Sequence, residues 1–108
     1  MERIVNIDGK NYRLVANGLT PKKYRELFGK EVFLGMQKAI GADSTILDSE
    51  VFENLAFCMA VQGGSMQEKT IDEWLEKLDN PMAIVEAASD ILEMWMAQTK
   101  TTSVGKKE

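Results

Sequence analysis

Residues 49–62, SEVFENLAFCMAVQ, decide the fold of this chain of 108 residues, because they are its most apolar segment with a helical period. The apolar residues that fall on one face are Phe52, Leu55, Ala56, Met59 and Ala60. Other apolar residues lie outside this stripe, as is typical of a helix that is surrounded by a core. Asp48 or Ser49 can cap its start, and Gly63-Gly64 ends it. We predict that this is the central helix.

Upstream, the chain opens with a predicted β-hairpin over residues 3–16. Asp8-Gly9 joins two β-prone runs, and this dipeptide tolerates the positive φ angles of a type I′ turn. Tyr12 and Leu14 alternate with polar residues, which indicates a strand with one buried face. Because a two-stranded hairpin is marginally stable by itself, we expect it to pack against the helices.

Two short helices are predicted between the hairpin and the central helix. Thr20 as N-cap, Pro21 at the first helical position and Gly29 as C-cap delimit the first of them. The second is EVFLGMQKAIG, residues 31–41, in which Gly41 can end the helix. Its apolar residues on one face are Val32, Phe33, Met36 and Ile40.

Two more helices follow the central one. Thr70 and Glu73 have the spacing of a capping box, which predicts a short helix over IDEWLEKL. Asn80 as cap and Pro81 at the first position begin the longest helix, which runs to about Thr99. Its periodic apolar residues are Ile84, Ala88, Ile91, Leu92 and Trp95.

These signals predict a mainly α domain of the α+β class, with an N-terminal hairpin followed by about five helices. The domain spans residues 1–99, and its helical body spans residues 20–99. Residues 100–108 are small, polar and basic apart from Val104, so we expect a flexible tail.

The composition argues against catalysis. The chain has no histidine, the commonest general base and metal ligand. Its one cysteine, Cys58, lies among apolar residues, where a thiol usually packs as a small hydrophobe. The carboxylates fall on helix faces that the apolar stripes leave to solvent. We therefore predict a non-enzymatic protein without metal or cofactor. No long apolar run or signal peptide is apparent, so we expect a soluble, intracellular protein that does not bind membranes.

Charge is distributed unevenly along the chain, whose net charge is -4. Residues 1–40 carry a net charge of +4, and residues 41–99 carry two basic against twelve acidic residues. The acidic half disfavours nucleic acid and suits a cationic partner. The other interpretation of these acidic side chains is that they keep the helical surface soluble.

Seven methionines and two tryptophans are many for this length. Methionine is frequent on surfaces that accept apolar partners, and tryptophan is frequent at binding hot spots. The alternative is that these side chains fill a small core. The candidate partner-binding residues are Met36, Met59, Trp74, Met94, Trp95 and Met96.

The order of these segments resembles a known family. IDGKNYRLVANGLTPKKYRELFGK, then a middle helix, a short tryptophan-containing helix and NPMAIVEAASDILEMW before a Lys/Thr-rich end, is similar to the tail assembly chaperones of long-tailed phages and prophages of Gram-positive bacteria. The likeness covers roughly residues 4–102. It implies a protein that binds the long, helical tape measure protein, keeps it soluble and helps to recruit tail tube subunits. Such a protein acts in the host bacterial cytoplasm and is not expected in the mature virion.

The family also suggests a reading of the chain end. Its gene commonly makes a second, longer product when ribosomes slip back by one base near the stop codon, and that product would reach the tail tube protein. Val104-Gly105-Lys106-Lys107 can be encoded by a slippery heptamer, although other codons encode the same residues. Self-association is left open as well, since an uncovered apolar helix can pair with a second copy.

Two other functions compete with this one. Lys22, Lys23 and Arg25 are the support for a small prophage regulatory or nucleic-acid-binding protein. An enzyme that relies on carboxylates ranks third.

Overall fold

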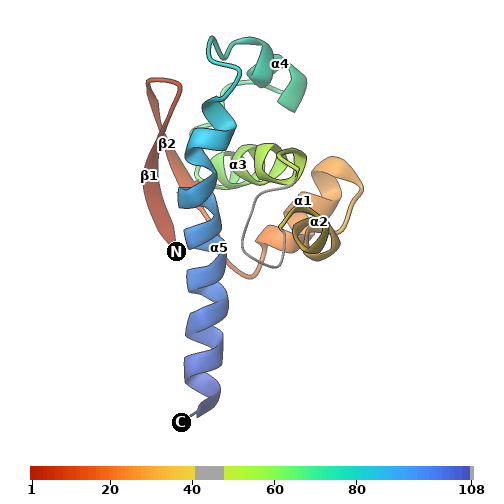
Figure 1. Cartoon of the computed structure of the whole chain (residues 1–108), viewed down its shortest axis with the longest axis vertical. Coiled ribbons are helices and arrows are strands. Elements are labelled where there is room, and N and C mark those ends of the chain that lie inside the picture. The colour runs from red at the N-terminus through yellow and green to blue at the C-terminus, as the bar shows by residue number, and fades with distance from the viewer. Residues whose placement is uncertain (41–47, 108) are drawn as a thin grey trace.

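The computed structural model describes the backbone of residues 1–40 and 48–107, and the side chains of residues 1–40 and 48–96. In this part of the chain a two-stranded antiparallel sheet and five helices surround one core (Figure 1). The elements are β1 Glu2–Ile7, β2 Lys10–Val15, α1 Thr20–Phe28, α2 Val32–Ala39, α3 Glu50–Gln62, α4 Ile71–Glu76 and α5 Ala83–Lys107. The predicted hairpin followed by a helical body is confirmed.

The hairpin turns at Asp8-Gly9, as predicted. Asp8 and Gly9 have φ angles of 57° and 84°, the positive values that a tight type I′ turn requires. Ile7 therefore pairs with Lys10, and this register continues along both strands. One face of the resulting sheet is buried, and its core residues are Val5, Ile7, Tyr12, Leu14 and Ala16.

The central position of α3 is also confirmed. It packs against β2, α1, α2, α4 and α5, and nine of its thirteen residues are buried. Ser49 occupies the N-cap position without a side-chain capping bond, and Asp48 before it accepts the N–H of Glu50 at 2.9 Å. Gly63 follows the helix, and Gly64 turns the chain with a φ of 72°.

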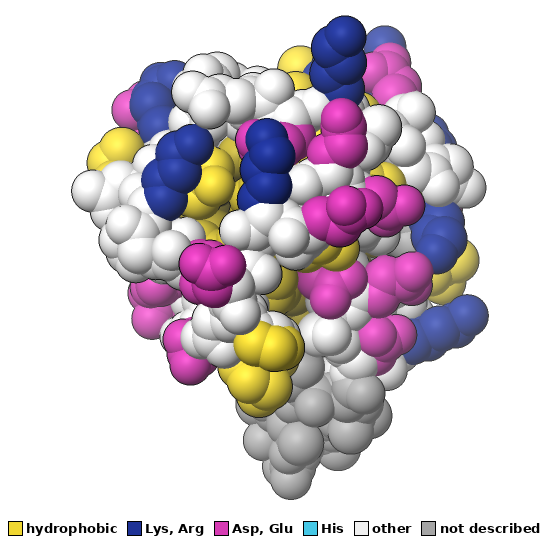
Figure 2. Space-filling model, turned by 90° about the horizontal axis from the view of Figure 1, so that it is seen from above, with side chains coloured by type: hydrophobic (Ala, Val, Ile, Leu, Met, Phe, Trp, Pro, Cys, Tyr) yellow, Lys and Arg dark blue, Asp and Glu magenta, His cyan; other side chains and the backbone are white. Residues whose placement is uncertain are grey.

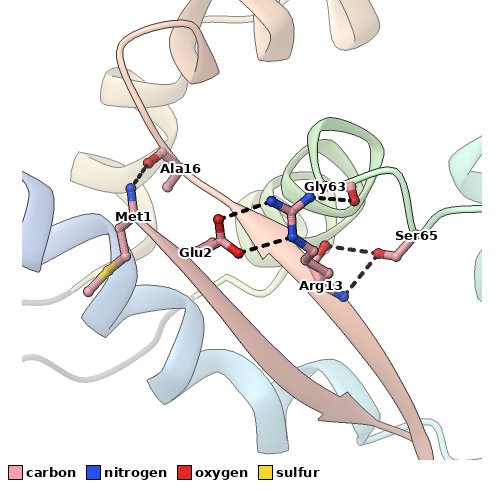
Figure 3. Close-up of polar contacts among 6 residues, drawn as sticks. All are labelled: Met1, Glu2, Arg13, Ala16, Gly63 and Ser65. Carbon is pink, nitrogen blue, oxygen red and sulfur yellow. Dashed lines mark hydrogen bonds and ion pairs between the residues drawn. The ribbon is translucent and has the colours of Figure 1, made fainter.

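A polar clamp joins the hairpin to the end of α3 (Figure 3). Arg13 of β2 donates two hydrogen bonds to the carboxylate of Glu2 and a third, of 3.0 Å, to the carbonyl of Gly63. Ser65 accepts the backbone N–H of Arg13 at 3.1 Å and donates to its carbonyl at 2.9 Å. At Gly63 the two backbones approach so closely that a Cβ would collide with the Arg13 carbonyl oxygen. This edge of β2 is therefore covered by the loop after α3.

One predicted cap was wrong in its mechanism. Thr20 is the first residue of α1 rather than its N-cap, and the cap position, Leu19, makes no side-chain hydrogen bond. The buried Thr20 hydroxyl instead accepts the N–H of Asn17 and donates to the side chain of Gln62 at 2.7 Å. Its tertiary partner on α3 thus takes the place of a local cap. Gly29 ends α1 in the left-handed conformation, as predicted.

The start of α4 follows the sequence signal, whereas α5 begins at Ala83, two residues after the predicted first helical position at Pro81. Thr70 accepts the N–H of Glu73 at 3.2 Å, and Asn80 accepts the N–H of Met82 at 2.9 Å. Asp8, in the hairpin turn, accepts the backbone N–H groups of both Asp79 and Asn80. The hairpin turn therefore fixes the point from which α5 departs.

Helix α5 extends beyond its predicted end at about Thr99. Its helical backbone continues to Lys107 and leaves the globular body (Figure 1). Since no proline interrupts this stretch, helix propagation needs no new nucleation there. The mobility of residues 100–108 stays a prediction, and the predicted end of the second helix at Gly41 lies outside the described residues. Among the described helices, none is both long and apolar enough to cross a bilayer.

Candidate functional site

Four of the six candidate partner-binding residues belong to the core. Met36, Met59, Trp74 and Met94 are at most 7% exposed. Trp74 also donates its indole N–H to the Tyr12 hydroxyl at 3.1 Å, which satisfies its one polar group inside the protein. These four were therefore wrong as surface contacts in this conformation, and the core-filling alternative holds for them. Trp95 is half-buried and Met96 is 47% exposed, so these two reach the surface.

The exposure of two apolar residues on α2 was not predicted from the sequence. Phe33 was assigned to the buried face, yet it is 55% exposed, and Leu34 beside it is 56% exposed. Val32 and Met36 take the inward positions instead. A signal was present, because four of the first five residues of this helix are apolar and cannot all share one face.

Exposed Phe33 of α2 contacts half-buried Trp95 of α5. The rings of Phe33 and Trp95 lie 5.3 Å apart between centroids and are tilted by 55°. Leu34 follows Phe33 on α2, and Met96 follows Trp95 on α5. We call Phe33, Leu34, Trp95 and Met96 the α2–α5 surface. This surface combines residues of two helices that are distant in the sequence, and all four of its side chains are large and apolar.

A hollow of about 400 Å³ borders this surface at Leu34. Its charged lining is largely paired within the protein: Lys30 lies 3.3 Å from Glu50, and Glu31 lies 3.1 Å from Arg25. Charges of both signs at the rim give no preference for an anionic or a cationic small molecule. Nothing in its lining resembles a catalytic arrangement.

A second hollow, of about 280 Å³, lies between the hairpin turn and α4. Here Lys77 donates to Glu68 at 2.8 Å, which lowers the pKa of the Glu68 carboxyl and raises that of the Lys77 ammonium. Asp8, also in the lining, is engaged by the backbone at the start of α5. These groups connect elements of the fold.

The one thiol is enclosed. Cys58 is fully buried on α3, and burial raises the pKa of its thiol to about 12. Its Sγ lies 3.8 Å from the carbonyl oxygen of Thr20. A thiol in this state is a poor nucleophile at neutral pH. Among the described residues, no three metal-binding side chains lie together as a metal site would require.

Acidic side chains dominate the helical half of the described surface. Between residues 48 and 96 there are eleven Asp/Glu and two Lys/Arg. Figure 2, seen from the α4 end, shows several clusters of acidic groups with basic groups around them and apolar groups in separate patches. The basic residues of α1 are partly neutralised, since Lys23 lies 4.0 Å from Glu26 and Arg25 pairs with Glu31. Comparisons of the chain with protein-family models, curated proteins and solved structures found no match.

Proposed function

We propose that this protein is a tail assembly chaperone of a long-tailed phage or prophage. It binds the tape measure protein in the host cytoplasm, keeps it soluble and helps to recruit tail tube subunits, and it does so by binding rather than by catalysis. The order of sequence segments described above supports this assignment.

The observation that carries the proposal is the α2–α5 surface. Phe33 and Leu34 are both more than half exposed although they are large and apolar. Exposed clusters of this kind are typical of protein interaction sites. Aromatic rings and a methionine can repack against different apolar side chains, which suits a client with many similar helical segments.

The charge of the protein supports a chaperone as well. An acidic surface keeps the protein soluble while its apolar side chains are exposed and no client is bound. The same charge steers basic segments of a client toward the surface and repels a second copy of the chaperone.

Co-expression with the tape measure gene of the same phage tests the proposal. We expect the tape measure protein to stay in the soluble fraction and to co-elute with the chaperone in size-exclusion chromatography. Equal solubility of the client with and without this protein, together with no co-elution, would end the proposal.

A pair of matched variants tests the surface. F33S/L34S removes the two exposed apolar side chains of α2, and we expect it to lose the complex. I4S/L19S is the control, because Ile4 and Leu19 are 61% and 52% exposed outside the α2–α5 surface. If the control loses client binding as strongly as F33S/L34S, the binding is non-specific and the site is wrong.

The nucleotide sequence of the gene tests whether a longer product can be made. We expect a slippery heptamer in the codons of residues 104–107 and a minus-one reading frame that continues past the stop codon. A gene that lacks both makes one product only.

A further inference from the structure

The exposed side of α5 carries an apolar stripe with coiled-coil spacing. Its members are Met82, Val85, Ser89, Leu92 and Met96, which follow one another at alternating steps of three and four residues. Met82 precedes the helix by one residue, but its carbonyl already accepts the helical hydrogen bond from the N–H of Glu86. Such steps place side chains along one line of a helix, here over about 21 Å. We call this set the α5 stripe.

The α5 stripe is distinct from the face of α5 that packs in the core. The core face consists of Ala83, Ile84, Ala87, Ala88, Ile91 and Met94, all at most 4% exposed. On the stripe, Met82, Val85 and Met96 are 53%, 39% and 47% exposed. Ser89 is exposed as well, and Leu92 is half-buried. A soluble helix normally needs one apolar face, and on the stripe only Leu92 packs against the core, so Met82, Val85 and Met96 are left largely to solvent.

Acidic residues follow one flank of the stripe. Glu86, Asp90 and Glu93 recur at steps of four and three residues, next to the apolar line. Arg3 of β1 reaches this flank, 3.1 Å from Glu93 and 3.6 Å from Asp90. One arginine for three carboxylates leaves the flank negative. The opposite side of the stripe faces α2, where Trp95 contacts Phe33.

The negative flank argues against a second copy of this helix as the occupant. If two α5 helices paired antiparallel about Ser89, Glu86 of one copy would lie beside Glu93 of the other. Like charges at these flanking positions destabilise a coiled coil, whereas opposite charges select the partner and its orientation. The complementary helix has apolar residues at the same spacing and lysine or arginine beside them.

We propose that the α5 stripe is the docking site of a basic amphipathic helix, which packs its apolar residues between Met82 and Met96 and its cations against Glu86 and Glu93. This deepens the proposed function by naming the chemistry of the client helix, and it rests on that function only for the client's identity. The mode is helix-on-helix packing, in which small Ser89 allows close approach at the centre. The α2–α5 surface continues the site at the Met96 end.

Binding of two synthetic peptides to the full chain tests the proposal. Both peptides span about three heptads with leucine at the apolar positions; one has lysine at the flanking positions and the other has glutamate. Titration followed by fluorescence anisotropy should show saturable binding of the lysine peptide and much weaker binding of the glutamate peptide. Binding of the lysine peptide should weaken with added salt, because the flanking charges are exposed.

Variants of the chain locate the site. M82S/V85S/M96S should weaken binding of the lysine peptide by about tenfold or more, because it removes most of the apolar area on the stripe. E86Q/E93Q should weaken it by about two- to fivefold and reduce its salt dependence. The matched control I4S/L19S, which changes exposed apolar residues elsewhere, should bind as the unchanged chain does. Circular dichroism of each variant verifies the fold.

Three results would overturn the proposal. The first is equal affinity for the lysine and glutamate peptides, and the second is undiminished binding to M82S/V85S/M96S. The third is a dimer in sedimentation equilibrium that the stripe variant abolishes and that excludes the lysine peptide, since the occupant is then a second copy. Tape measure solubility separates the two proposals: if the stripe variant keeps that client soluble, the stripe is wrong but the chaperone function stands. If the chain binds the lysine peptide but never the tape measure protein, the chaperone function fails alone.

Discussion

Helix α3 and helix α5 contain the same kinds of apolar residue in opposite surroundings. Met59 of α3 is fully buried, and Met96 of α5 is 47% exposed. The cause is the number of neighbours: α3 packs against β2 and all four other helices, whereas α5 packs along β1 and α3 and touches α2 through the contact of Trp95 with Phe33.

 
As a result α3 is enclosed, whereas one side of α5 faces solvent. Residue type gives a side chain the capacity for burial, and the surrounding elements decide whether it is buried in the core or left at the surface.

The largest expected effect tests the enclosed region. Trp74→Ala removes a buried side chain that contacts the rings of Tyr12 and Phe57, and we expect a loss of about 3–5 kcal/mol in the free energy of unfolding. Urea denaturation followed by circular dichroism measures it. Trp74→Phe keeps most of the packing but leaves the Tyr12 hydroxyl without its donor, so it should cost distinctly less. A loss below about 1 kcal/mol for the alanine variant would show that Trp74 is not a core residue.

The second prediction concerns the junction between β2 and the end of α3. Gly63→Ala places a Cβ against the carbonyl oxygen of Arg13, and backbone must shift to admit it. We expect a loss of about 1–3 kcal/mol in the free energy of unfolding. Gly18→Ala is the control, because a Cβ at Gly18 meets nothing within 4 Å. Equal stability of the two variants in urea denaturation would contradict the close approach.

The third prediction concerns the exposed region. Phe33→Ser should lower the free energy of unfolding by no more than about 1 kcal/mol, because the side chain is 55% exposed and loses mainly its contact with the Trp95 ring. Met36→Ser, on the inward face of the same helix, should cost several times as much. Thermal unfolding of the two variants measures the difference. If Phe33→Ser destabilises the protein as much as Met36→Ser does, α2 has no free face.

The smallest expected effect concerns the exposed pair of Glu2 and Arg13. The hydrogen bonds from Arg13 lower the pKa of the Glu2 carboxyl below its ordinary value of 4.5. A lowered pKa in the folded state means that the pair stabilises the fold above pH 4.5 and that this contribution is lost as the pH falls through the lowered value. The melting temperature of Glu2→Gln should therefore lie slightly below that of the unchanged chain at neutral pH and should converge with it in acid.

Glu76→Gln is the matched control for this pH series, because Glu76 is exposed and has no ion-pair partner among the described residues. Its melting temperature should differ from that of the unchanged chain less than the Glu2 variant does. A constant difference between Glu2→Gln and the unchanged chain at all pH values would show that the Arg13 pair does not act through the Glu2 charge.

Local signals were enough to predict most element boundaries. Asp8-Gly9, Gly29 and Thr70 act through their own backbone angles or through a bond three residues away, so a sequence pattern contains all that they need. Thr20 shows the limit of such signals. Its hydroxyl does not cap α1 but accepts the N–H of Asn17 and donates to Gln62, a partner 42 residues away.

The candidate site was predicted less well for the same reason. Trp95 and Met96 reach the surface, but Met36, Met59, Trp74 and Met94 do not, and nothing local separates these two groups. Phe33 was missed because periodicity gives the faces of a helix without saying which one meets the core. The stripe from Met82 to Met96 could have been found by its spacing, but the core face of α5 gave the stronger periodic signal.

The sequence by itself determined where the chain turns, which segments are helical and that the helical half is acidic, because these properties depend on residues close together in the chain. Only the tertiary structure decided which apolar faces are buried. That choice depends on how many elements surround each helix, and α3 lies among all the others while α5 passes along one side. The apolar side chains left exposed on α2 and α5 are therefore a property of the packing, and they are the side chains that we propose contact a partner.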